Sequence, residues 1–151
     1  MLWEVEILPS QDSRDHEGQR VLSDAKSLGI DALSEVRSAR SFLIQGDLTE
    51  ADAGRAAEVL LCDGVVEQYR VKALPENGSA EPSSCLNVLL HPGVTDSVAE
   101  NATRALTELD LQVTAVATCR KYWLTGDLSD SEQTRVTSRV LANDAIEYVI
   151  A

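Results

Sequence analysis

The two halves of this sequence repeat one another, and this repeat limits the possible folds more than any other feature. Residues 40–49 read RSFLIQGDLT, and residues 120–129 read RKYWLTGDLS. Weaker correspondences flank them, pairing residues 5–9 with 88–92, 28–30 with 109–111, 60–63 with 140–143 and 66–67 with 146–147. Solenoid repeats are roughly 20–50 residues long and need three or more copies. We therefore predict two whole folding units fused in one chain, equivalent to a dimer.

The length of the chain supports a shared core. A chain of 151 residues buries a substantial core, whereas half of that length is marginal for an independent domain. We therefore expect the halves to share a buried surface and the chain to be monomeric in solution.

The charge and the cysteines limit the partners and the compartment. A net charge of −12 repels polyanions, which argues against nucleic acid and anionic membranes as partners, although acidity also serves solubility alone. Cys62, Cys85 and Cys119 are odd in number and lack a CxxC pair. This pattern argues against a disulfide framework or a zinc site and favours the cytoplasm. No run approaches the ~20 apolar residues of a membrane span.

Hydrophobic periodicity predicts the same elements in both halves. In the first half, Gly29 should end the first helix, and Thr49 with Asp52 should cap the second. Ser38 and Ala39 would form a tight hairpin turn, although they lack the usual Asn-Gly signal. The expected elements are a strand at 2–8, a helix around 21–28, strands at 30–37 and 40–46, a helix from 50 to 61 and a strand at 65–71.

The second half follows the same plan. Ser129 and Glu132 form a capping box. The expected elements are a strand at 86–90, a helix around 98–109, strands at 112–118 and 120–126, a helix through Val136 to Leu141 and a strand at 145–150. Both faces of the central strands carry apolar residues. We therefore predict an α+β fold of two β-α-β-β-α-β units, whose antiparallel sheets pack as a pseudo-twofold intrachain dimer with the helices outside. The repeats would span residues 1–73 and 86–151, joined by a linker at 74–85 rich in turn-forming residues.

Few residues suggest catalysis. His16 and His91 have no partner at a spacing that indicates a nucleophile, a base or a metal site. Asp47 and Asp127 follow glycines at matching places, where turn formation explains them. There is no Walker motif and no GxGxxG sequence. We predict no catalytic, cofactor-binding or metal-binding residues.

The scarce cations are placed regularly. Arg37 and Arg40 flank the first expected hairpin, and Arg120 and Lys121 lie at the second. They are candidate residues for docking an acidic partner or a phosphate. The alternative is that cations at strand ends discourage edge-to-edge pairing.

Four stretches of the chain, at residues 15–18, 36–40, 60–69 with its counterpart 140–148, and 91–96, look like the motifs of a known family. They resemble the PurS family, the small subunit of phosphoribosylformylglycinamidine synthase. The resemblance covers nearly the whole chain except the linker, and the motifs occur in the same order in both halves. The family's V-R-x-G-K looks like residues 36–40, D-P-x-G looks like 15–18, L-L-x-N-x-V-I-E-x-Y is similar to 60–69 and 140–148, and K-P-G-V-x-D looks like 91–96.

This resemblance implies a scaffold rather than an enzyme. PurS subunits bridge an ATP-dependent synthetase to a glutaminase and help ammonia pass between them. The chain looks like a tandem PurS-like pair, either a separate subunit or the N-terminal domain of a long synthetase. The expected partners are the synthetase and glutaminase, and ATP, Mg and glutamine would belong to them, with no cofactor on this chain.

A second reading of the same pattern is a regulatory module. Tandem ACT domains also pair β-α-β-β-α-β units and bind amino acids between the copies. They typically place a glycine-containing loop after the first strand. Pro92 and Gly93 fit this expectation, whereas residues 9–11 do not.

Overall fold

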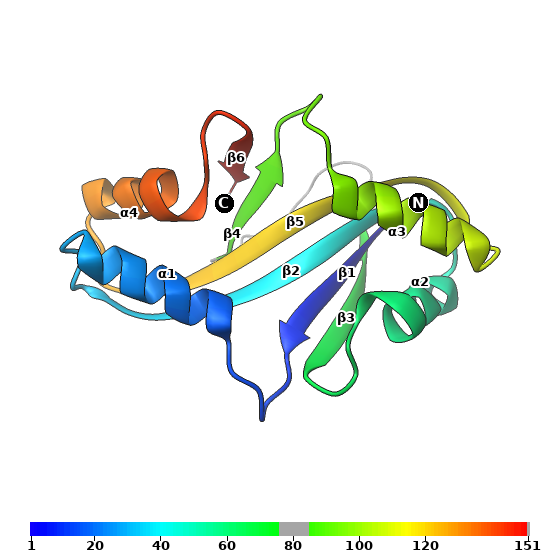
Figure 1. The fold of residues 1–151 in the computed structure, drawn as a ribbon, viewed down its shortest axis with the longest axis horizontal. Coiled ribbons are helices and arrows are strands. Elements are labelled where there is room, and N and C mark those ends of the chain that lie inside the picture. The colour runs from blue at the N-terminus through cyan, green and yellow to red at the C-terminus, as the bar shows by residue number, and fades with distance from the viewer. Residues whose placement is uncertain (76–84, 151) are drawn as a thin grey trace. The chain divides into compact units, whose positions relative to one another are not determined.

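The computed structural model describes residues 1–75 and 85–150. Figure 1 shows strands and helices alternating along both halves of the chain. The first half contains β1 (Leu2–Pro9), α1 (His16–Ser27), β2 (Leu33–Asp47), α2 (Glu50–Ala56), the π-helical turn η1 (Ala57–Leu61) and β3 (Glu67–Leu74). The second half contains β4 (Cys85–Leu90), α3 (Ser97–Glu108), β5 (Gln112–Gly126), α4 (Asp130–Val136), the π-helical turn η2 (Thr137–Leu141) and β6 (Glu147–Ile150).

The strands form one antiparallel sheet, which confirms the predicted α+β class. The order of the six strands is β3-β1-β2-β5-β4-β6. Trp3 of β1 faces Ile44 of β2, and Val5 faces Phe42, so the apolar positions of these strands lie on one face. The expectation of two separate packed sheets was wrong, because β2 and β5 are neighbours in a single sheet.

The two expected hairpins are also absent from the described residues. β2 and β5 are each an uninterrupted strand of 15 residues, so each half has the order β-α-β-α-β instead of β-α-β-β-α-β. Ser38 and Ala39 are buried inside β2, and neither has a positive φ. Tight hairpin turns need residues such as Asn or Gly that adopt positive φ, and this pair offers neither. The β-α-β-β-α-β order on which the ACT-like alternative depended is therefore not found in the described residues.

The chain folds into two compact units, each assembled from both halves of the sequence. Among the described residues, unit 1 comprises residues 1–14, 39–75 and 95–119, and unit 2 comprises residues 15–38, 85–94 and 120–150. Each unit contains a helix from the other half, and β2 and β5 each contribute to both units. The repeat boundaries at 1–73 and 86–151 stay a prediction about the sequence. Most of the expected linker, at 76–84, lies outside the described residues.

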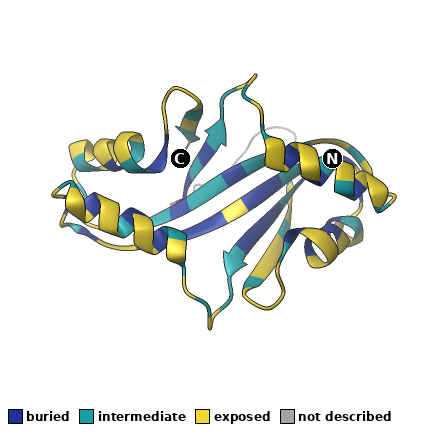
Figure 2. Cartoon of the chain, in the orientation of Figure 1, coloured by how far each residue is buried: buried dark blue, intermediate teal, exposed yellow. Residues whose placement is uncertain are grey.

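Unit 1 has its own hydrophobic core. Helices α2 and α3 cover one face of β1 and of the part of β2 in this unit, and Figure 2 shows their inner sides buried. The indole of Trp3 donates a hydrogen bond to the carbonyl of Leu48, 3.1 Å away. The core consists of Trp3, Val5, Ile7, Phe42, Ile44, Leu48, Ala53, Ala56, Ala57, Leu61, Ala102, Leu106 and Leu111.

Unit 2 has an equivalent core beneath α1 and α4. Its largest fully buried side chain is that of Tyr122 on β5. The core consists of Val21, Ala25, Ile30, Leu33, Val36, Leu86, Val88, Tyr122, Val136, Leu141 and Ala142. The first-half helix α1 therefore packs with second-half elements, as α3 does in reverse in unit 1.

Matching N-caps fix the first helix of each half. The carboxylate of Asp15 accepts hydrogen bonds from the amide of Gly18 and from both the amide and hydroxyl of Ser38. Asp96 accepts the same set from Ala99 and Thr118. A side-chain cap satisfies a helix N–H that would otherwise lack a partner. Here the cap also attaches each helix to the middle of a long strand.

The other predicted helix signals are confirmed. Thr49 with Asp52 and Ser129 with Glu132 both form capping boxes. Gly29 follows α1 with a φ of 80°, the left-handed conformation typical of a helix end. No helix in the described part of the chain is long and apolar enough to cross a membrane.

Glycines permit close strand packing at the end of each long strand. A Cβ atom on Gly46 would lie 2.1 Å from the carbonyl oxygen of Gln112 in unit 1. A Cβ atom on Gly126 would lie 2.2 Å from the carbonyl oxygen of Ala32 in unit 2. Any larger residue at either position would push neighbouring backbone apart.

Candidate functional site

Arg40 forms a clip that closes unit 1. Its Nη2 donates hydrogen bonds to the carbonyl of Leu61, at 3.1 Å, and to Oε1 of Glu67, at 2.8 Å. Its Nε donates to Oε2 of Glu67 at 3.3 Å. The Glu67 carboxylate also accepts a hydrogen bond from the backbone amide of Asp63 at 2.9 Å. The arginine thereby joins the middle of β2 to the end of η1 and the start of β3.

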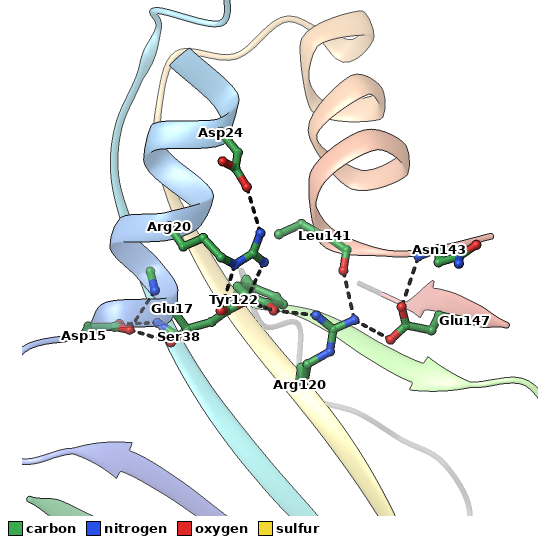
Figure 3. A network of polar contacts seen from close by, with 11 residues as sticks. Asp15, Glu17, Arg20, Asp24, Ser38, Arg120, Tyr122, Leu141, Asn143 and Glu147 are labelled. Carbon is green, nitrogen blue, oxygen red and sulfur yellow. Dashed lines mark hydrogen bonds and ion pairs between the residues drawn. The ribbon is translucent and has the colours of Figure 1, made fainter. Parts of the chain in front are cut away.

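Arg120 forms the same clip in unit 2. Its Nη2 donates to the carbonyl of Leu141 at 3.0 Å and pairs with Glu147. Glu147 in turn accepts a hydrogen bond from the backbone amide of Asn143 at 3.1 Å (Figure 3). We call these two sets the Arg40 clip and the Arg120 clip. Both arginines satisfy carbonyls at a helix C-terminus, which is a structural role.

In unit 2 a polar network extends the Arg120 clip across α1. Nη1 of Arg120 donates to the hydroxyl of Tyr122 at 2.9 Å, and this hydroxyl donates to Oε1 of Glu17 at 2.8 Å. Glu17 pairs with Arg20 at 2.7 Å, and Arg20 pairs with Asp24 at 2.8 Å. Figure 3 shows these side chains converging between α1 and β5. They occupy the space above the clip.

The network fixes the protonation states of its members. The hydrogen bond from Arg20 lowers the pKa of Glu17, and the bond from Tyr122 acts in the same direction. Burial raises the pKa of Tyr122 to about 12, assisted by the hydrogen bond to Glu17. At neutral pH a carboxylate therefore accepts a hydrogen bond from a neutral phenol, which keeps its proton, and this arrangement stabilises the contact without reactive chemistry.

In unit 1 the matching space is an open groove. Counting along each helix from the Asp15 and Asp96 caps, Val98, Asn101 and Ala105 stand where α1 has Glu17, Arg20 and Asp24. Phe42 stands on β2 where β5 has Tyr122. The groove has a volume of about 460 Å³ and is lined by Arg40, Phe42, Leu60, Leu61, Cys62, Asp63, Glu67, Val98, Asn101, Ala102 and Ala105. Smaller and less polar side chains leave it unfilled.

Cys62 forms part of the wall of this groove. Burial raises the pKa of its thiol, so the thiol is not activated as a nucleophile. Cys62, Cys85 and Cys119 are all present as thiols. The described residues contain no group of three or more His, Cys, Asp or Glu placed to hold a metal ion.

The four cations predicted to dock a partner fall into two kinds. Arg40 and Arg120 form the clips, while Arg37 and Lys121 lie over the ring of Trp123, at 5.7 and 5.9 Å from its centroid. All four lie within long strands, so their placement at hairpin tips was wrong. Whether any of them contacts a partner stays a prediction.

Sequence reasoning missed the network around Tyr122. The spacing of Glu17, Arg20 and Asp24 at i, i+3 and i+7 indicates salt bridges along one helix face. That signal is local. The contact with Tyr122 joins residues distant in sequence, so it depends on which helix packs over β5.

The fold and the clips together define a class: α+β proteins in which arginines on long antiparallel strands bind carbonyls at helix ends. Within that class, residues 2–75 match the model of the PurS family, described as phosphoribosylformylglycinamidine (FGAM) synthase. This segment belongs to the PurS family, and the match implies involvement in FGAM synthase of purine biosynthesis. A comparison with curated proteins gave no significant match.

Proposed function

We propose that the chain is a non-catalytic bridging component of FGAM synthase. It would hold the ATP-dependent synthetase and the glutaminase together and assist the transfer of ammonia between them. The observation that carries this proposal is the family match over residues 2–75, which runs from β1 through β3.

The side-chain chemistry of the clips supports a structural role. The carboxylates of Glu67 and Glu147 and the guanidinium groups of Arg40 and Arg120 contact one another and backbone atoms. A general acid or base must reach a substrate proton, and a nucleophile needs an adjacent base. These groups instead connect elements of the fold.

We further propose that the two halves are a tandem PurS-like pair. The matching helices and long strands have equal lengths, with helices of 12 and 7 residues and a long strand of 15 residues in each half. The N-cap contacts and both clips also recur at matching positions. In this proposal the chain works in the cytoplasm, and ATP, Mg and glutamine bind to the partners. The thiol state of the three cysteines supports this compartment.

The test compares glutamine-dependent with ammonia-dependent activity. The synthetase and glutaminase of the source organism are assayed with and without this chain, after co-purification establishes whether the three bind. We expect glutamine-dependent FGAM formation to fall when the chain is removed, while ammonia-dependent formation persists. Equal activities with and without the chain would exclude the bridging role.

A further inference from the structure

Unit 2 shows which chemical groups fit the space that is open in unit 1. The Glu17 carboxylate reaches the edge of the Arg120 clip through Tyr122, and the rest of the space is filled by α1 side chains. The same framework in unit 1 has the Arg40 clip but Val98, Asn101 and Phe42 around it. Unit 2 therefore provides an intramolecular template for an occupant of the groove.

The entrance of the groove in unit 1 is apolar and exposed. Val98 is 55% exposed and Leu60 is 41% exposed, and both line the groove. Val59, beside Leu60 on η1, is 60% exposed. In unit 2 the positions matching Val98 and Val59 hold Glu17 and Arg139. Contiguous exposed apolar residues mark a surface that another molecule covers.

The Arg40 guanidinium adds a polar anchor at the base of this groove. Among the described residues, its Nε and Nη2 donate to Glu67 and Leu61, whereas its Nη1 has no acceptor. The matching Nη1 of Arg120 donates to Tyr122. A carboxylate is the natural acceptor for a guanidinium N–H, because charge-assisted hydrogen bonds are the stronger kind.

We propose that the groove of unit 1 docks a segment of a partner protein that presents an aliphatic side chain beside a carboxylate. The aliphatic group would pack between Val98 and Leu60, and the carboxylate would accept from Nη1 of Arg40. Exposed apolar surface continues past the groove lining at Val59, so the occupant is larger than a small molecule. The inference rests on the proposed function, which supplies the synthetase or glutaminase as the partner.

The decisive variant transplants the unit 2 filling into unit 1. Phe42→Tyr, Val98→Glu, Asn101→Arg and Ala105→Asp together recreate the network, so the fold is retained while the groove is closed. The transplant adds one net negative charge. Ser23→Asp on the exposed side of α1 is the matched control, since it adds the same charge away from the groove.

Binding of the purified synthetase and glutaminase to each variant is measured by calorimetry or biosensor. We expect the transplant to weaken binding of one partner by about tenfold or more, as loss of a central contact does, with the control unchanged. Circular dichroism checks that the transplant folds. If it does not, the single variant Val98→Glu replaces it, and the same tenfold loss of binding is expected.

The outcomes separate the two proposals. If the wild-type chain binds neither partner, the bridging proposal fails. If the wild type binds a partner and the closed-groove variant binds it equally well, the groove inference is overturned while bridging stands. If sedimentation shows self-association of the wild type that the transplant abolishes, the occupant is a second copy of the chain, and the partner-docking inference is overturned.

Discussion

Units 1 and 2 share a frame but differ in what fills it. Both have an aspartate N-cap tied to a long strand, an arginine clip at the end of a π-helical turn and an arginine that caps a neighbouring helix. In unit 1, Arg55 donates this capping hydrogen bond to the Leu109 carbonyl, and in unit 2, Arg135 donates it to the Leu28 carbonyl. The ties that match are directed mainly at backbone atoms, whereas the side chains on the covering helix face differ.

Because of this difference, we expect unit 2 to be the more stable unit and unit 1 to have the more accessible surface. In unit 2 the polar network stabilises the fold and leaves α1 polar, while in unit 1 the same space stays open beneath an apolar entrance. Hydrogen bonds to charged groups contribute about 1.5–3 kcal/mol each when shielded, less when exposed. We therefore expect unit 2 to resist local opening more than unit 1.

The largest expected effect comes from dividing the chain. Residues 1–75 contain α1 but lack α3, whose Ala102 and Leu106 complete the core of unit 1. Expressed alone, they should not form a stable folded monomer, because each compact unit needs segments of both halves. Analytical ultracentrifugation with circular dichroism checks this. A folded monomer of residues 1–75 would contradict the exchange of helices between the halves.

Removing the arginine of a clip should destabilise the chain less than dividing it does, and by different amounts in the two units. Arg120→Met removes the donor to Glu147, to the Leu141 carbonyl and to the Tyr122 hydroxyl, and should lower the free energy of unfolding by about 2 kcal/mol. Arg40→Met should cost about 1 kcal/mol, because the Arg40 side chain is more exposed (47% against 37%) and has no tyrosine partner. Urea denaturation measures both. An equal cost would show that the network adds nothing to the Arg120 clip.

A smaller effect should come from exchanging the aromatic residues above the clips. Tyr122→Phe removes a hydroxyl that both donates and accepts, and should cost about 1–2 kcal/mol. The reverse change, Phe42→Tyr, places a hydroxyl beside the open groove and should change stability by less than about 0.5 kcal/mol. Thermal unfolding of both variants makes the comparison. A larger loss for Phe42→Tyr would mean that the groove has no room for the hydroxyl.

The sequence was sufficient to predict the helices, but not to predict which strands each helix packs against. Thr49, Ser129 and Gly29 act locally, so their caps could be predicted from neighbouring residues alone. The long strands were misread because the apolar pattern of residues 40–46 is the same whether or not a turn precedes it. The missing turn signal at Ser38 and Ala39 was the evidence that favoured a continuous strand.

The candidate site was predicted only in part for a related reason. Arg40 and Arg120 were found by their matching positions, but their acceptors lie on segments that only the tertiary fold brings near. The exchange of α1 and α3 between units leaves no local signal, because both helices have the same length and the same cap. The groove follows from that exchange, so sequence patterns alone did not reveal it.

The smallest expected effect is a pH dependence confined to unit 2. The pKa of Glu17 is lowered in the folded chain by Arg20 from its ordinary value of 4.5, so the ionised form is favoured by folding. The resulting stability is present above the unfolded pKa and is lost as the pH falls through the lower folded value. Because the side chain is 40% exposed, the gain should be below about 1 kcal/mol. Glu17→Gln should therefore destabilise the chain at pH 7 and lose this difference from the wild type at an acid pH below the folded pKa of Glu17, as measured by urea denaturation. Val98→Gln, at the matching position in unit 1, adds no titrating group and should show the same difference from the wild type at both pH values. A Glu17→Gln difference that does not shrink in acid would place the stabilising contribution of Glu17 in its packing rather than in its charge.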